Sequence, residues 1–155
     1  MIVADTSPLN YLILIGAIDI LPKLFQEIVI PDAVKQELLS VGALPKVRKW
    51  AENFPDWIEI RSVGPVEEDI NLGKGEVEAI SLAIEFSAEW VLLDDKAARA
   101  AAEERELPII GTLGLIKIAH DEKLLDFIST VKELQSTNFR ISQTIMSELL
   151  DRYES

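Results

Sequence analysis

The sequence predicts an α/β fold in which crossover helices connect the strands of a small parallel sheet. Short apolar runs typical of buried strands alternate with amphipathic helical patterns, the arrangement expected of a parallel sheet. The chain has 155 residues, of which 48% are hydrophobic and 27% charged, and it contains no repeat and no linker. These values indicate one globular domain with a proper core.

The predicted strands are short, apolar and far apart in the sequence. Each is bounded by a charged residue, a proline or a helix start, as Pro31 bounds the second. They are Met1–Asp5, Glu27–Ile30, Trp57–Ile60, Trp90–Leu93 and Ile109–Ile110.

Helices are predicted between these strands and after the last one. The first begins with Ser7 as its N-cap and Pro8 at its first helical position. The others are Asp19–Phe25, Asp32–Ser40, Pro45–Asn53, Gly75–Phe86, Lys96–Arg105, a helix capped by Thr112 that runs to His120, more helix to Leu134, and Ser142–Tyr153. The Gly-, Pro- and acid-rich segment from Val63 to Lys74 predicts a solvated loop.

Composition excludes several classes of function. With 27 acidic and 15 basic residues the net charge is −12, so the overall field repels nucleic acid and a simple basic-patch binder is not expected. The chain has no Cys and one His, His120, which excludes disulfide scaffolds, thiolate zinc sites, iron–sulfur clusters and His-cluster metal sites. Its chemistry must therefore come from carboxylates, hydroxyls, Lys or Arg.

The longest nearly apolar run, Leu9–Ile18, is far shorter than a membrane span of about 20 residues. The N-terminus lacks a basic region before an apolar stretch, so no signal peptide is expected. A cytoplasmic protein is the default expectation.

Carboxylates follow two of the predicted strands. Asp5 ends the first strand, and Asp94 and Asp95 follow the fourth. In open α/β sheets, sites form outside the carboxyl ends of the strands. Helix capping is the alternative explanation, and it is equally good for Asp94 and Asp95. It is weaker for Asp5, because Ser7 is the better placed cap.

Two glutamates lie on predicted apolar helix faces. Glu37 shares a face with Val34 and Val41, where a carboxylate needs a partner, although it could also snorkel from the edge of that face. Glu76 begins the inward stripe of its helix, whereas Glu78 is expected to face water with Lys74, Ser81 and Glu85. A first-turn glutamate favoured by the helix dipole is the alternative for Glu76.

Together these residues predict several inward carboxylates near one sheet edge. Acids this close cannot all stay ionised without a counterion. A hard divalent cation such as Mg²⁺ takes oxygen ligands and is commonly completed by substrate phosphate. Two such ions could activate water and stabilise the leaving oxygen of a phosphodiester. The cation would also reduce the repulsion between an acidic protein and an anionic substrate.

Other polar residues near this edge could position a water molecule or a phosphate. The hydroxyls belong to Thr6, Ser7 and Thr112, for which capping and turn formation are equally good explanations. Lys96 and Arg99 could contact a backbone phosphate, but a solvated helix face is the simpler explanation.

The most basic local stretch is the run from Pro45 to Trp50, which ends in an aromatic residue. It could guide a single strand of nucleic acid, although a solvated amphipathic helix is the simpler interpretation. His120 lies near a helix C-terminus and is assigned no catalytic role.

Five segments occur in a familiar order: IVADTSPLNYL, IVIPDAVKQEL, GKGEVEAISLA, VLLDDKAARAAAE and IIGTLGLI. In this respect the chain resembles the PIN-domain superfamily, which includes the VapC-type toxins of prokaryotic toxin–antitoxin modules. It most resembles a branch of short prokaryotic proteins described as predicted nucleic-acid-binding PIN proteins. The motifs run from Ile2 to about Ile116. The resemblance implies a three-layer α/β/α fold, with one such domain over residues 1–155 and a C-terminal helical extension from about residue 136.

The resemblance also implies an activity, namely Mg²⁺- or Mn²⁺-dependent cleavage of single-stranded RNA. The four acids of the family map onto Asp5, Glu37, Glu76 and Asp95, with Asp94 as a further possible metal ligand. Most members have Asp where this chain has Glu76, which puts rate and metal preference in doubt. The family's frequent hydroxyl beside the first acid corresponds to Thr6 or Ser7. An inhibitory antitoxin partner and a homodimer are implied on the same basis.

Three alternatives fit the sequence less well. A carboxylate phosphatase of the haloacid-dehalogenase type would need a second Asp two residues after Asp5, where Ser7 stands. A receiver domain would need its acid pair after the first strand, which supplies only Asp5. The non-enzymatic alternative is an attenuated PIN domain that acts as a binding or regulatory module, and Glu76 is the residue that favours it.

Overall fold

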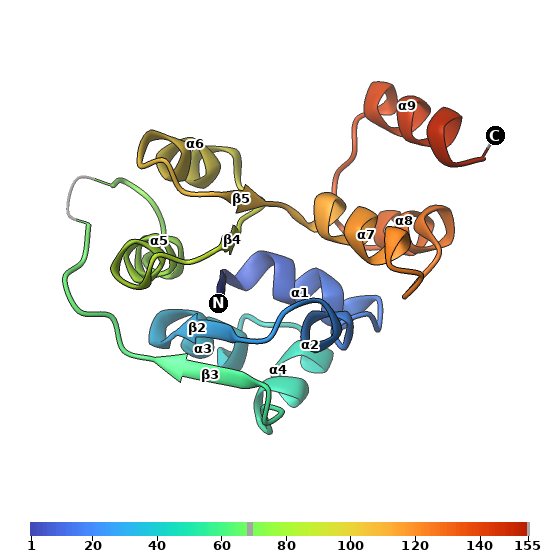
Figure 1. The fold of residues 1–155 in the computed structure, drawn as a ribbon. Coiled ribbons are helices and arrows are strands. Elements are labelled where there is room, and N and C mark those ends of the chain that lie inside the picture. The colour runs from blue at the N-terminus through green and yellow to red at the C-terminus, as the bar shows by residue number, and fades with distance from the viewer. Residues whose placement is uncertain (68–69, 155) are drawn as a thin grey trace. The chain divides into compact units, whose positions relative to one another are not determined.

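The structure, a computed structural model, describes residues 1–67 and 70–154. Within these residues, five strands form one parallel sheet in the order β3-β2-β1-β4-β5 (Figure 1). The strands are β1 (Ile2–Ala4), β2 (Ile28–Pro31), β3 (Ile58–Arg61), β4 (Trp90–Leu92) and β5 (Ile109–Ile110). Each lies within one or two residues of its predicted position.

The helices also lie close to their predicted ranges. They are α1 (Thr6–Leu14), α2 (Ile20–Leu24), α3 (Asp32–Leu39), α4 (Pro45–Ala51), α5 (Lys74–Phe86), α6 (Lys96–Glu104), α7 (Thr112–Asp121), α8 (Phe127–Gln135) and α9 (Gln143–Glu154). The predicted start of the first helix is wrong. Asp5 has the extended backbone of an N-cap, and Ser7 lies inside the helix.

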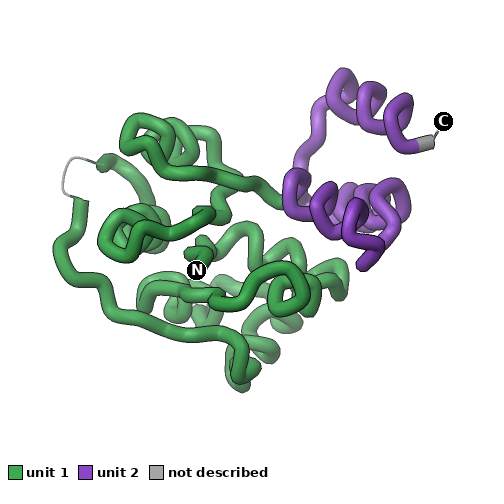
Figure 2. The backbone as a smooth tube through the Cα atoms, in the orientation of Figure 1, with its two compact units in different colours: residues 1–112 green, residues 113–155 purple. Residues whose placement is uncertain are grey.

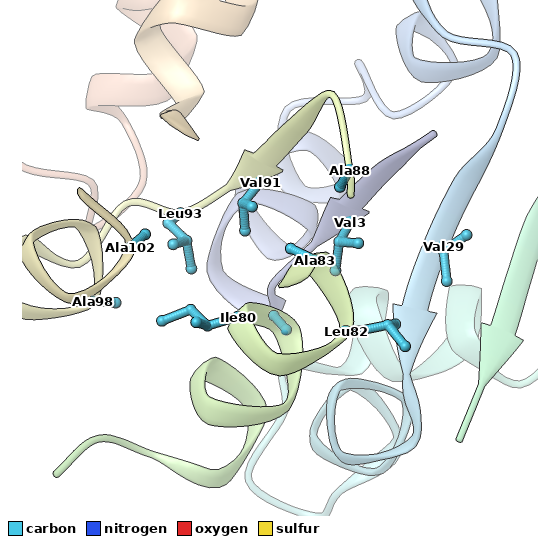
Figure 3. Packing of buried hydrophobic residues seen from close by; sticks show 11 residues of the cluster. Val3, Val29, Ile80, Leu82, Ala83, Ala88, Val91, Leu93, Ala98 and Ala102 are labelled. Carbon is cyan, nitrogen blue, oxygen red and sulfur yellow. The ribbon is translucent and has the colours of Figure 1, made fainter. Parts of the chain in front are cut away.

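Both faces of the sheet are buried, as a parallel sheet requires. Val3, Val29 and Val91 belong to a core cluster with α5 and α6 on one face, and Figure 3 shows their side chains beside Ile80 and Leu82 of α5. The alternate strand residues, such as Ile2 and Ile28, are equally buried and point to the opposite face. This confirms the predicted three-layer α/β/α fold.

The segment between β3 and α5 is less solvated than predicted. Val63, Ile70 and Leu72 pack against the core cluster. The Glu67 N–H donates to Ser81 Oγ at 2.9 Å, and Ser81 is 3% exposed. The prediction that Ser81 faces water is therefore wrong, because this segment covers that side of α5. Residues 68 and 69 of the predicted loop lie outside the described residues.

The chain divides into two compact units, residues 1–112 and 113–155 (Figure 2). In the second unit, Tyr153 of α9 stacks on Phe127 of α8 at 4.1 Å between ring centroids. The Phe127 N–H donates to His120 Nδ1 at 3.0 Å, so His120 has a structural partner within this unit. The prediction of one domain with a C-terminal extension stays a prediction. None of the helices in the described residues has the length and apolar character to cross a bilayer.

Candidate active site

The sheet has one point at which the strand order reverses. The chain runs outward through β1, β2 and β3, and then returns to add β4 and β5 on the other side of β1. Ala4 pairs with Leu92, and the Asp5 N–H donates to the Leu92 carbonyl at 3.1 Å. The carboxyl ends of β1 and β4 thus lie side by side, where ligands bind in open α/β sheets.

Asp5 occupies this point and is 4% exposed. Its Oδ1 atom is buried and accepts no hydrogen bond from the described residues. The pKa of Asp5 rises from 3.8 to about 7, mainly because the carboxyl is buried and also because the charges of Glu76, Glu37 and Asp94 lie near it. The Thr6 backbone N–H, which favours the ionised form, works against this rise.

Glu37 reaches the same place from α3. Its Oε2 accepts a hydrogen bond from the Thr6 hydroxyl, and its Oε1 accepts one from the Gly75 N–H at 3.3 Å. A Cβ at position 75 would lie 2.7 Å from Glu37 Oε1, so this approach requires glycine. The predicted apolar face with Val41 is wrong. The helix ends at Leu39, and Val41 is 95% exposed.

Glu76 lies half-buried in the first turn of α5. Its Oε1 accepts from the Gly73 N–H at 3.2 Å, so it caps the helix. Burial chiefly raises the pKa of Glu76, with added contributions from the charges of Asp95 and Glu37, against the Gly73 hydrogen bond.

Glu78 was predicted to face water, and this prediction is wrong. Its Oε1 accepts from the Ala33 N–H at 3.1 Å, one of the free donors of the first turn of α3. Glu78 thereby ties α5 to the helix that carries Glu37. Glu78 and Ala33 are 45 residues apart, so no local pattern could have indicated this contact.

Asp94 and Asp95 have different partners. Asp94 Oδ1 accepts from the Thr112 N–H at 2.7 Å, and its Oδ2 accepts from the Thr112 hydroxyl at 2.6 Å. Burial is the main cause that raises the pKa of Asp94, against these two hydrogen bonds and the Arg99 charge. Asp95 is exposed and caps α6 by accepting from the Ala98 N–H at 3.0 Å. The hydroxyl of Thr112, expected to cap a helix, is instead committed to Asp94.

Two cations lie beside the carboxylates. Lys96 and Arg99 line a pocket of about 400 Å³ together with Asp94, Ala100 and Glu103. A Cβ at position 111 would lie 2.8 Å from an Arg99 guanidinium nitrogen and 3.1 Å from Asp94 Oδ1. Gly111 therefore leaves the space in which the guanidinium approaches Asp94. Ser7 lies half-buried in the first turn of α1.

The carboxylates thus come from distant segments and act on one another. The charges of Glu37, Glu76 and Asp94 raise the pKa of Asp5, and that of Asp95 raises the pKa of Glu76. Among the described residues, no three acidic or imidazole side chains are grouped closely enough to hold a metal ion as they stand. In donor chemistry the site fits a hard divalent cation, because the carboxylates supply oxygen ligands and the buried Oδ1 of Asp5 has no hydrogen-bond partner among the described residues.

The family described as "DUF3368: PIN domain" matches the chain over residues 1–155. The chain belongs to this PIN-domain family. PIN domains are typically nucleases, and they generally use divalent metal ions. The resemblance noted from the sequence is therefore confirmed.

A solved structure shows the same fold. It is a PilT N-terminus domain protein, SSO1118, from the hyperthermophilic archaeon Sulfolobus solfataricus P2. The two chains are 18% identical, with a TM-score of 0.51 over 91% of this PIN domain and 98% of that protein. None of the curated proteins compared with the chain matches it. The roles predicted for individual site residues stay predictions.

Proposed function

We propose that this PIN domain is an endoribonuclease that cleaves single-stranded RNA with Mg²⁺ or Mn²⁺ as its cofactor. The observation that carries the proposal is Asp5, a buried carboxylate at the strand-order reversal, with a pKa of about 7 and one oxygen that no described residue hydrogen-bonds. A group that is costly to ionise alone becomes favourable to ionise when a cation shares its site. Asp5, Glu37, Glu76 and Asp95 are the proposed metal ligands, with Asp94 beside them.

The bound cation would supply an activated water and stabilisation of the leaving oxygen. The chain's own residues hold and orient the participants. Thr6 fixes the Glu37 carboxylate by its hydroxyl, and Thr112 fixes Asp94 by two hydrogen bonds. Lys96 and Arg99 offer positive charge to a phosphate beside the carboxylates, in a pocket with room for one nucleotide phosphate. The Ser7 hydroxyl is a further proposed contact for water or phosphate.

The direct test uses a mixed-sequence single-stranded RNA incubated with Mg²⁺, Mn²⁺ or EDTA. The wild-type protein should cleave it with either metal and not with EDTA, and Asp5→Asn should be inactive. Asp121→Asn is the matched control. Asp121 is exposed and lies in the second compact unit, which contains none of the proposed metal ligands, so this variant should leave cleavage unchanged. Cleavage that persists in EDTA or in Asp5→Asn would overturn the proposal.

A second candidate is a binding module that lacks turnover. It is favoured by the hydrogen bonds that hold Glu37 and Glu76 on backbone N–H groups, and by the lack of a tight three-ligand group in the described residues. Metal binding seen by calorimetry without any RNA cleavage would select it. Conversely, metal-dependent cleavage that is lost in Asp5→Asn would remove it.

The biological setting is proposed from the family resemblance alone. The enzyme would act in the cytoplasm as a homodimer, and as a toxin restrained by an antitoxin protein. Light scattering of the purified protein tests the dimer. Growth arrest on induced expression, absent for Asp5→Asn, tests the toxin role, and rescue by the product of an adjacent gene tests the antitoxin.

A further inference from the structure

We propose that α4 and the aromatic residues after it form a binding surface for single-stranded RNA, separate from the carboxylate site. We call it the basic–aromatic surface and define it by Lys46, Arg48, Lys49, Trp50, Phe54 and Trp57. The inference rests on the proposed function, since it states how a polyanion is held by an acidic enzyme.

The charge of α4 is opposite in sign to the net charge of the whole molecule. The helix carries three cations and no acid in seven residues, whereas the chain has a net charge of −12. Arg61, by contrast, forms ion pairs with Glu59 and Glu27. In the described part of the chain, none of the three α4 cations forms an ion pair. Their charge is therefore available to an external anion.

The spacing of these residues gathers charge and aromatic surface on one side of the helix. Lys46, Lys49 and Trp50 stand at positions i, i+3 and i+4, which share a helix face. Lys46 and Lys49 are exposed, and Trp50 is half-buried. Lys46 Nζ donates to the Leu14 carbonyl at 3.2 Å, which anchors the face to the end of α1.

The aromatic rings form a braced group rather than isolated side chains. The ring centroid of Trp50 lies 5.3 Å from that of Phe54, edge to face, and 6.2 Å from that of Trp57. All three residues are only partly buried. Rings held in this way offer stacking faces to bases without losing much side-chain freedom on binding.

The position of α4 links this surface to the site. The helix packs against α1 and α3, the helices that carry Thr6 and Glu37. A strand bound on α4 would lie on the same compact unit as the carboxylates. The cations of α4 would then offset part of the repulsion that the net charge imposes on RNA.

The pairing of cations with aromatic rings favours RNA over an acidic peptide. Phosphates account for the cations in either case, but bases also use the three rings. An acidic peptide would make no comparable use of Trp50 and Trp57. Binding that depends on both the cations and the aromatic rings would therefore identify RNA as the ligand.

The test measures binding rather than cleavage, so the failure of the nuclease proposal does not decide it. The background is full-length Asp5→Asn protein, titrated with a fluorescein-labelled 12-nucleotide RNA in EDTA. The test variant is Lys46→Gln/Arg48→Gln/Lys49→Gln, since Gln keeps helix propensity. The control is Lys23→Gln/Lys117→Gln/Arg152→Gln. It removes three exposed, dispersed cations and so lowers the net charge by the same three units.

We expect the test variant to bind RNA at least about tenfold more weakly at about 0.1 M salt. The slope of log K against log salt concentration should become shallower by about 2, since each neutralised phosphate contributes roughly 0.7. The control should stay within about twofold of the parent. Equal losses in the two variants would mean a general field effect and would overturn the proposal. So would RNA binding that the α4 substitutions leave unchanged, even if the wild type cleaves RNA.

A second measurement examines the rings. RNA binding should quench tryptophan fluorescence, and Trp57→Leu should weaken binding to the RNA more than to an abasic oligomer of the same length. Polyglutamate that competes as well as RNA of equal charge would show a surface for acidic chains in general and overturn the assignment. Thermal unfolding of every variant confirms that it is folded.

Discussion

Asp5 is a buried carboxylate in surroundings that disfavour its charged form. A carboxylate 4% exposed is ordinarily satisfied by hydrogen bonds, yet its Oδ1 has none from the described residues. Three further acids approach it and raise its pKa. The fold thus tolerates a locally unfavourable group, as functional sites commonly do.

This pKa makes stability depend on pH in the metal-free protein. Asp5 titrates near 3.8 when unfolded and near 7 when folded. Below about pH 4 both states hold the proton. As the pH rises toward 7, the unfolded chain releases it first and the free energy of unfolding falls, by up to about 4 kcal/mol. Above pH 7 the loss is complete.

Asp5→Asn should remove this decline. Urea unfolding in EDTA at pH values from 4.5 to 8 should give a flatter profile for Asp5→Asn than for the wild type, and Asp121→Asn should keep the wild-type slope. A profile for Asp5→Asn that matches the wild type would show that Asp5 is not the responsible group.

Gly75 tests the placement of Glu37. In Gly75→Ala the new methyl would lie 2.7 Å from Glu37 Oε1 and would displace the carboxylate. Alanine is otherwise better than glycine in a helix by about 1 kcal/mol, so stability should change little. RNA cleavage should fall at least about tenfold. Gly42→Ala, whose Cβ would meet only Ser40 Oγ at 3.8 Å, should keep full activity.

At the scale of elements, the N-cap residue of α6 has two possible roles. Asp95 caps the helix, and it is also a proposed metal ligand. Asn is as good an N-cap as Asp, whereas Ala costs about 1 kcal/mol. The substitutions Asp95→Asn and Asp95→Ala therefore separate capping from metal binding.

We expect Asp95→Asn to keep wild-type stability in urea and to lose metal affinity and cleavage. Asp95→Ala should lose both stability and activity. If Asp95→Asn retains full cleavage, Asp94 rather than Asp95 is the ligand. The parallel variant Asp94→Asn then becomes the inactive one.

The elements were largely predictable from local sequence. Apolar strand runs and helical stripes placed every strand and helix within a few residues, because burial on both faces of the sheet imposes those patterns. Apart from the start of α1 and the end of α3, the errors occur at contacts between elements. Ser81 and Glu78 were assigned to water, whereas one receives the Glu67 N–H and the other receives the Ala33 N–H.

At the scale of the whole molecule, metal should couple to folding. The proposed ligands repel one another in the metal-free protein, so a cation that binds only the folded state should raise the melting temperature. At a free Mn²⁺ concentration a hundredfold above its dissociation constant, the free energy of unfolding should rise by about 2.7 kcal/mol.

The gain should be larger at pH 8 than at pH 5.5, because the pKa values of Asp5, Glu76 and Asp94 are raised and protons compete with the metal. Calorimetric scans with Mn²⁺ or EDTA at both pH values measure it. Asp5→Asn should abolish the shift in melting temperature and Asp121→Asn should keep it. An equal shift at both pH values would contradict linkage to these carboxylates.

The sequence by itself determined the α/β class, the order of the elements and the acids that follow the strands, since these depend on local patterns of burial and capping. The tertiary structure alone decided the partners. Thr112 meets Asp94 across 18 residues, and Gly75 meets Glu37 across 38. Such contacts arise when crossover connections bring the ends of β1 and β4 together. Local sequence patterns do not indicate which distant donor will contact a given carboxylate.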